Sequence, residues 1–176
     1  MTCSIGFRAP AFQELGEAFL QFMAESIDLP GCYADPALKP TANPAKLDSA
    51  MLKTVGAQLQ KVRFTDDDIA IFMGEYLSEP ATSVLYTPPK RALPRARFVE
   101  AAARRGITLS LKSRMFYRGG HVFINGESFA ASRADRGVLS ALADRRALVP
   151  AELASLSADV ADALHLWYCD GWLTLR

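Results

Sequence analysis

The chain has 176 residues, of which 50% are apolar and 22% are charged, a composition typical of globular proteins. This length allows one sizeable hydrophobic core or two small ones. No apolar run approaches the roughly 18–20 residues that cross a bilayer, and the N-terminus lacks the basic start and apolar centre of a signal peptide. The sequence therefore predicts a cytoplasmic protein without a membrane partner.

The net charge of +1 conceals two halves of opposite charge. Residues 1–89 contain 6 Lys/Arg and 11 Asp/Glu, which gives −5, whereas residues 90–176 contain 14 and 8, which gives +6. Such an asymmetry predicts two units with different surfaces.

The first half of the chain predicts a short strand followed by three helices. The strand falls within the first seven residues and is closed by Pro10; because no neighbouring segment can pair with it, it resembles the last strand of a sheet formed elsewhere. Apolar residues at helical spacing predict helices over about 11–27, after Pro44 and after Thr65. Their apolar stripes are wider than a three-helix bundle needs, which favours a homodimer. The residues expected at the dimer interface are Phe12, Leu15, Phe19, Phe22, Leu52, Val55, Leu59 and Phe72.

The third helix begins with the acidic run Asp66–Asp68, which has two possible roles, a divalent-cation site or a helix cap. Thr65 and Asp68 have the spacing of a helix N-cap and its reciprocal acid. Carboxylates in the first turn of a helix offset the partial positive charge of its unpaired N–H groups, by about 0.3–1 kcal/mol each. The capping interpretation is therefore favoured over a metal site.

The second half predicts a small mixed domain after a proline-rich linker. Four prolines in residues 79–94 exclude a helix interior there. A short helix, a strand, a hairpin with two glycine turns, two further helices and a closing strand then describe a winged-helix-like unit. The elements expected are a helix over 96–105, a strand at Leu109–Leu111, turns at Gly119-Gly120 and Asn125-Gly126, helices from Ser132 or Asp135 to about Leu148 and from Ser157 to Cys169, and a strand at Trp172–Leu175.

Together these patterns predict a mainly α protein with an α+β tail, in which a three-helix dimerisation bundle precedes a winged-helix-like domain. The expected boundaries are a strand and linker over 1–10, the helical dimerisation domain over 11–78, the linker over 79–94 and the winged-helix-like domain over 95–176.

Histidine is too scarce for an iron site of the 2-His-1-carboxylate type, which needs two imidazoles and a carboxylate on one face of the metal. The chain contains only His121 and His165, and neither lies in an His-x-Asp or His-x-Glu pair. His121 follows a glycine turn and is expected to be exposed. His165 could pair with Cys169 as base and nucleophile, but the apolar residues around it favour core packing. We therefore expect no catalytic residue, no metal ligand and no bound cofactor.

The basic half of the chain raises a second hypothesis, a stand-alone winged-helix protein that binds nucleic acid. Against it, the helix after Ser157 carries Asp159 and Asp162 on its polar side, and no helix offers a uniformly basic face. Contact with a protein surface is favoured over nucleic acid. The candidate basic surface consists of Arg95, Arg97, Arg104, Arg105, Arg114 and Arg118.

Four short motifs resemble, in the same order, segments of the bacterial ribosomal oxygenases. Ser4-Ile5-Gly6-Phe7-Arg8-Ala9-Pro10 is similar to the segment that joins their catalytic and helical domains, and Tyr33-Ala34-Asp35-Pro36 to their Tyr-x-Asp-Pro loop. Val122-Phe123-Ile124-Asn125-Gly126-Glu127 resembles their Asn-Gly-Glu hairpin, and Gly171-Trp172-Leu173 their closing strand. The motifs span essentially the whole chain.

The resemblance implies a place in a larger enzyme. Members of the family are JmjC-type (cupin) hydroxylases that use Fe(II) and 2-oxoglutarate to modify an arginine of a large-subunit ribosomal protein. Their iron ligands lie upstream of the Ser-Ile-Gly-Phe-Arg segment, so the catalytic barrel is expected outside this chain, and Thr2 and Ser4 would line it near the cosubstrate. The resemblance thus implies a non-catalytic scaffold that dimerises and helps to dock a ribosomal protein substrate.

Overall fold

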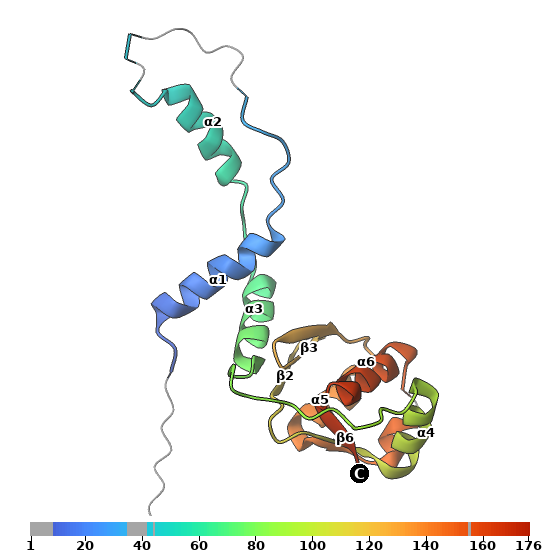
Figure 1. Ribbon diagram of the computed structural model, residues 1–176. Coiled ribbons are helices and arrows are strands. Elements are labelled where there is room, and N and C mark those ends of the chain that lie inside the picture. Colours follow the sequence, from blue (N-terminus) through green and yellow to red (C-terminus); the bar gives the residue numbers. More distant parts are fainter. Residues whose placement is uncertain (1–8, 35–41, 44, 155) are drawn as a thin grey trace, which may run out of the picture. The chain divides into compact units, whose positions relative to one another are not determined.

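The computed structural model describes residues 9–34, 42–43, 45–154 and 156–176 (Figure 1). The strand expected in the first seven residues, with Thr2 and Ser4, lies outside the described residues. The chain divides into two compact units, residues 1–69 and 70–176, and each is described by itself. In the described residues no helix is both long enough and apolar enough to span a membrane.

The first unit is helical, as predicted, with α1 (Phe12–Ser26) and α2 (Ser49–Leu59). Each begins where a carboxylate accepts one or more hydrogen bonds from backbone N–H groups at the start of the helix. In α1 the Ala11 N–H donates to Glu14 at 3.0 Å. In α2 the carboxylate of Asp48 accepts from the N–H groups of Ala50 and Met51 at 2.7 and 3.1 Å.

The helix α3 (Asp66–Ser78) begins at the predicted cap. The Thr65 N–H and hydroxyl donate to the Asp68 carboxylate at 2.7 and 2.8 Å, and the Asp68 N–H donates to the Thr65 hydroxyl at 3.2 Å. The Thr65 hydroxyl and N–H together hold the pKa of Asp68 below its usual value, because they stabilise the charged carboxylate. These bonds give Asp68 a structural role, as the capping interpretation expects.

The second unit contains the predicted winged-helix-like domain, together with most of α3 and the segment 79–94 (Figure 1). It contains two antiparallel three-stranded sheets, with strand orders β5-β1-β6 and β2-β3-β4. Its elements are α4 (Arg95–Arg105), β1 (Ile107–Leu109), β2 (Met115–Arg118), β3 (His121–Ile124), β4 (Glu127–Ala130), α5 (Arg136–Arg145), β5 (Ala147–Leu148), the 3-10 helix η1 (Pro150–Leu153), α6 (Ala158–Cys169) and β6 (Leu173–Leu175).

The core of this domain forms around the central strand β1. Ile107 lies opposite Leu148 of β5 and Leu175 of β6, and it is completely buried. Helices α4, α5 and α6 cover the strands with apolar side chains such as Phe98, Leu139 and Leu164, each no more than 1% exposed. Burying such side chains stabilises the fold by about 1.5–3 kcal/mol each.

The wing hairpins follow the predicted turns. Asn125 and Gly126 have φ of 52° and 91°, the positive values that a type I′ turn requires. Gly119, in the first turn, also has a positive φ of 59°. The turns place β2, β3 and β4 side by side, with Phe116 opposite Phe123 and Val122 opposite Phe129.

Two predicted boundaries were wrong. The helix expected to reach Leu148 ends at Arg145, because Arg146 adopts a left-handed conformation with φ of 58° and its guanidinium donates to the carbonyls of Ser110 and Ser113. Leu148 can then pair with β1. The strand expected at Leu109–Leu111 is shifted to Ile107–Leu109, and Leu111 is 94% exposed.

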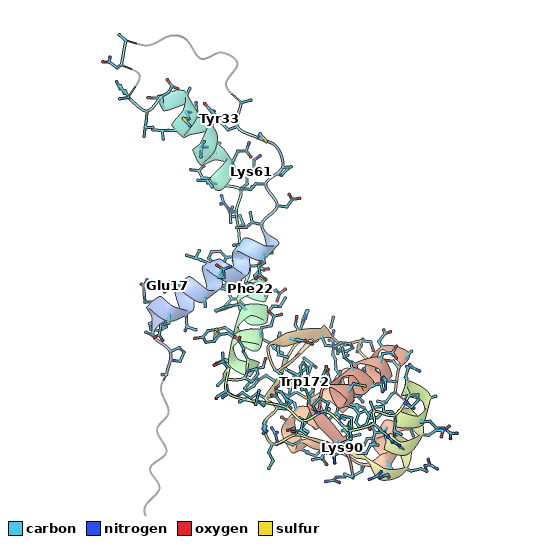
Figure 2. All side chains as sticks on the ribbon, in the orientation of Figure 1. Glu17, Phe22, Tyr33, Lys61, Lys90 and Trp172 are labelled. Atoms are coloured by element: carbon cyan, nitrogen blue, oxygen red, sulfur yellow. The ribbon has the colours of Figure 1, made fainter. Side chains whose placement is uncertain are left out.

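The proline-rich segment 79–94 lies against the winged-helix domain. Tyr86 packs on Trp172, with ring centroids 6.2 Å apart, and Trp172 lies among the crowded side chains of this domain (Figure 2). The Lys112 ammonium donates to the carbonyl of Leu85 at 2.6 Å. These contacts fix the segment on the domain surface.

The C-terminal part of α3 packs on the hairpin so closely that only glycine fits at one position. A Cβ at Gly74 would lie 2.3 Å from the Phe123 ring. We expect Gly74→Ala to lower the free energy of unfolding by about 1–3 kcal/mol, because overpacking outweighs the gain in helix propensity. Gly137→Ala in α5, where no atom lies within 4 Å, is the matched control and should be neutral or stabilising. Urea unfolding followed by circular dichroism measures both, and equal stability of the two variants would contradict this packing.

Candidate interaction surfaces

In the first unit, α1 and α2 each leave large apolar side chains exposed within a single chain. Phe12, Leu52 and Leu59 are 94%, 56% and 60% exposed, and α2 has no buried residue. Such large exposed apolar patches usually mark an interface. The other expected interface residues differ in burial: Val55 is exposed, Leu15, Phe19 and Phe22 are half-buried, and Phe72 is buried.

The pair His165 and Cys169 is close but cannot act as base and nucleophile in this arrangement. The Cys169 Sγ lies 3.6 Å from His165 Nε2, and the same Nε2 lies 2.8 Å from the carbonyl oxygen of Leu93. Because a carbonyl only accepts hydrogen bonds, Nε2 must carry the proton and cannot take one from the thiol. The imidazole instead packs beside the stacked rings of Phe98 and Tyr168, at centroid distances of 5.5 and 6.4 Å.

The residues that the structure describes do not fit an iron site. His121, expected to be an exposed turn residue, is instead the half-buried first residue of β3; its backbone pairs with β2 and β4, and its ring stacks on Phe123 at 6.2 Å. Across the described parts of the chain, no group of three His, Cys, Asp or Glu residues is placed to hold a metal ion. No step of oxygen chemistry can therefore be assigned to these side chains.

The expected basic surface is largely occupied by contacts within the domain. Arg95 forms an ion pair with Asp162, and Arg97 one with Glu100 at 3.1 Å. The other four arginines fall into two groups. Arg105 and Arg114 donate to the backbone carbonyls of Arg176 and Glu79. Arg104 and Arg118 are exposed and have no partner among the described residues. The structure thus does not present six free cations on one face.

A groove between β4 and α6 is the feature that sequence analysis missed. It has a volume of about 430 Å³ and a floor that includes Phe129 and Trp167, which meet edge to face at 6.2 Å. Three carboxylates line it, those of Glu127, Asp159 and Asp162. The spacing of the two aspartates on one helix was visible in the sequence, but their meeting with β4 depends on the tertiary fold.

The electrostatics of the groove are negative. Partial burial and the nearby charge of Asp170 raise the pKa of Glu127, since both disfavour the charged carboxylate. Arg95 offsets one of the three lining carboxylates, that of Asp162. A surface of this kind repels phosphate and attracts cations.

Comparison with known proteins identifies the family to which this fold belongs. The sequence profile of the ROXA-like winged helix family matches residues 57–174, about two thirds of the chain. The chain belongs to this family. The match runs from within α2 to within β6, and so includes every element of the winged-helix domain from α4 to α6 and most of β6.

The matches to this ROXA-like chain include a ribosomal protein hydroxylase and structures of a ribosomal oxygenase. It is 25% identical over 182 residues to the ribosomal protein uL16 3-hydroxylase of Escherichia coli K12, an alignment that covers 97% of this chain and 48% of that protein. An X-ray structure of E. coli YcfD shares the fold, with a TM-score of 0.72, 20% identity and coverage of 98% of this chain and 46% of YcfD. The structure of the ribosomal oxygenase YcfD with cobalt and 2-oxoglutarate matches with a TM-score of 0.68 and 22% identity, over 98% of this chain and 48% of that one. The chain thus spans about half the length of the relatives it matches.

In this ROXA-like domain, Asp135 holds the beginnings of α5 and α6 together and so positions one wall of the groove. It is 5% exposed; its carboxylate accepts from the Ser132 hydroxyl at 2.5 Å and from the Ser157 N–H at 3.4 Å. The Ser132 hydroxyl is the main cause of the lowered pKa of Asp135, with Ser157 contributing. Ser157 in turn caps α6 by accepting from the Val160 N–H at 3.3 Å.

The lowered pKa predicts a pH-dependent contribution to stability. A group whose pKa is lower in the folded state stabilises fully above its unfolded pKa, about 3.9 for Asp, and loses the effect as pH falls through the folded value. We expect Asp135→Asn to lower the free energy of unfolding at neutral pH by about 1–3 kcal/mol, because hydrogen bonds to a charged group are lost. The difference from wild type should shrink below a pH of about 4. Urea titrations across pH, with Glu100→Gln as an exposed control, measure it; a difference that is constant down to strongly acidic pH would contradict the role of the charge.

Proposed function

We propose that this chain is the non-catalytic portion of a ribosomal protein hydroxylase, in which it dimerises and docks the protein substrate. The observation that carries the proposal is the coverage: the alignment takes in 97% of this chain but 48% of the uL16 3-hydroxylase. The chain's two histidines, His121 and His165, support it, because both are engaged in packing within the winged-helix domain. Fe(II) and 2-oxoglutarate would then bind in the half of the full-length enzyme that this chain does not match.

The exposed apolar residues of the first unit support dimerisation. Phe12 on α1 and the stripe of Leu52 and Leu59 on α2 expose apolar area that water solvates poorly, at a cost of about 25 cal/mol for each Å². A second copy that covers this stripe removes that cost. Stable pairs of this type bury roughly 1,200–2,000 Å² or more.

The charge of α6 supports a protein partner over nucleic acid. In helix-turn-helix and related folds, one helix enters the major groove and meets a high density of phosphates. Here α6 presents Asp159 and Asp162 in exposed positions. Ribosomal proteins that bind RNA carry many lysines and arginines, so carboxylates on this surface suit such a partner.

Dimerisation can be tested with a matched pair of variants on α2. Leu52→Asp together with Leu59→Asp places two carboxylates in the apolar stripe, and we expect sedimentation velocity to shift from dimer to monomer. Ala57 is exposed and lies on the opposite side of α2 by the helical period, so Ala57→Asp should leave the dimer intact. A wild-type monomer at micromolar concentration would contradict the proposed dimer.

Docking can be tested with a purified uL16 ribosomal protein. We expect the chain to bind it in isothermal titration calorimetry, with an affinity that falls as salt rises because opposite charges attract across the interface. A double-stranded DNA and an RNA hairpin of matched length serve as controls, and the chain should retard neither of them in gel electrophoresis at low salt. Tight binding of nucleic acid without binding of uL16 would instead support the stand-alone nucleic-acid-binding alternative.

A further inference from the structure

We propose that the groove between β4 and α6 binds an extended, arginine- or lysine-bearing segment of a protein partner, which adds to the free edge of β4. This inference rests on the proposed docking function and assigns it to one site. Three independent features of the described residues meet there: unneutralised carboxylates, an aromatic floor and an unpaired strand edge.

The carboxylates provide the charge complementarity. Glu127 on β4 and Asp159 on α6 both line the groove, and neither has an ion-pair partner among the described residues. Asp162, one turn further along α6, shows the kind of contact available, because its carboxylate already accepts the Nε–H of Arg95. A second guanidinium placed between Glu127 and Asp159 would form charge-assisted hydrogen bonds of the same type.

The floor suits the side chain of arginine or lysine along its full length. The rings of Phe129 and Trp167 line the groove, and Leu166 on its rim is 54% exposed. Methylene groups of a long cationic side chain can pack on such apolar surface while the charged head reaches the carboxylates. A guanidinium can also lie on the face of an aromatic ring.

The outer edge of β4 offers backbone groups to an extended partner. β4 is the last strand in the order β2-β3-β4, so it pairs with β3 along one edge only. Beyond its end, the Ala131 N–H donates to the Gly120 carbonyl at 2.7 Å; with the alternation of an antiparallel ladder, the peptide groups of Ser128 and Ala130 then point away from β3. An added strand would pair with these groups, as in β-augmentation, and place alternate side chains over the groove.

The same features argue against other occupants of the groove. Phosphate backbones would meet Glu127 and Asp159 at close range, a like-charge contact that disfavours nucleic acid. A metal ion would need ligands drawn tightly together, and no such group of His, Cys, Asp or Glu is found in the described residues. A cationic peptide is attracted by these carboxylates and needs no tight cluster of ligands, because its charges can be spread along the groove.

The test uses the full chain and a fluorescein-labelled peptide of alternating arginine and valine. Fluorescence polarisation should show binding that weakens with salt, and a peptide with citrulline in place of arginine should bind at least roughly tenfold more weakly, because citrulline has the shape of arginine without its charge. A peptide with N-methyl groups on alternate backbone amides should also bind more weakly, since it cannot pair with β4. Equal binding of the arginine and citrulline peptides, or of the methylated and unmethylated ones, would overturn the inference.

Matched variants locate the site. Glu127→Gln with Asp159→Asn should weaken peptide binding by roughly tenfold or more, whereas Glu100→Gln with Asp144→Asn, which removes the same charge from exposed positions outside the groove, should change it by less than about twofold. In wild-type protein the peptide should also slow amide hydrogen exchange at Ser128 and Ala130. Equal losses in the two double variants, or unchanged exchange at both amides, would show that the peptide binds elsewhere.

The groove and the docking function can fail separately. If the variant Glu127→Gln with Asp159→Asn keeps full affinity for uL16, the groove is not the docking site and the inference is wrong, while the proposed function stands. If wild-type protein does not bind uL16 at all, the proposed function fails, and the peptide experiments still decide whether the groove captures cationic segments.

Discussion

The buried side chain of Asn125 connects the parts of the winged-helix domain on which its surfaces depend. It is 8% exposed; its Oδ1 accepts from the Arg114 N–H at 3.0 Å, and its Nδ2 donates to the Ser113 hydroxyl at 3.3 Å. That hydroxyl donates in turn to the carbonyl of Trp172 at 2.8 Å. A buried amide with its hydrogen bonds made is stabilising, whereas one left unpaired costs about 1–3 kcal/mol, so the network favours a single arrangement of hairpin and closing strand.

The neighbouring Gly126 extends this constraint to α3. Its N–H donates to the hydroxyl of Ser78 at 2.9 Å, and Ser78, completely buried, donates to the carbonyl of Glu75 at 3.0 Å. Because the Asn125-Gly126 turn is fixed from both sides, β4 leaves it in one direction and runs beside α6. The acidic groove is a consequence of that direction.

The sequence predicted those parts of the fold that depend on neighbouring residues. The Asn125-Gly126 turn, the Thr65 and Ser157 caps and the helical periods are local, since each follows from the conformation or hydrogen bonding of a few adjacent residues. The end of α5 was missed because Arg146 leaves the helix to bind carbonyls more than thirty residues away in the sequence. No local signal reports such a distant partner.

The functional surfaces can likewise be divided into those that local sequence predicts and those that depend on the tertiary fold. The apolar stripe of the first unit and its expected role in a dimer follow from helical spacing alone, and the relationship to ribosomal oxygenases follows from four short motifs. The contacts of the expected basic surface could not be predicted, because charge counts do not show that Arg95 is paired with Asp162 or that Arg105 and Arg114 bind backbone carbonyls. The groove could not be predicted, since Glu127 and Asp159 meet only through the tertiary fold.

The proposed non-catalytic role requires that the chain itself performs no oxygen chemistry. The packing of His121 on Phe123 and the hydrogen bond from His165 to a carbonyl support this requirement. The most direct measurement is to incubate the purified chain with Fe(II), 2-oxoglutarate, oxygen and uL16, and to quantify succinate and hydroxylated uL16 by mass spectrometry. We predict neither product above the protein-free background. Stoichiometric iron binding with turnover of 2-oxoglutarate by this chain would contradict the proposal.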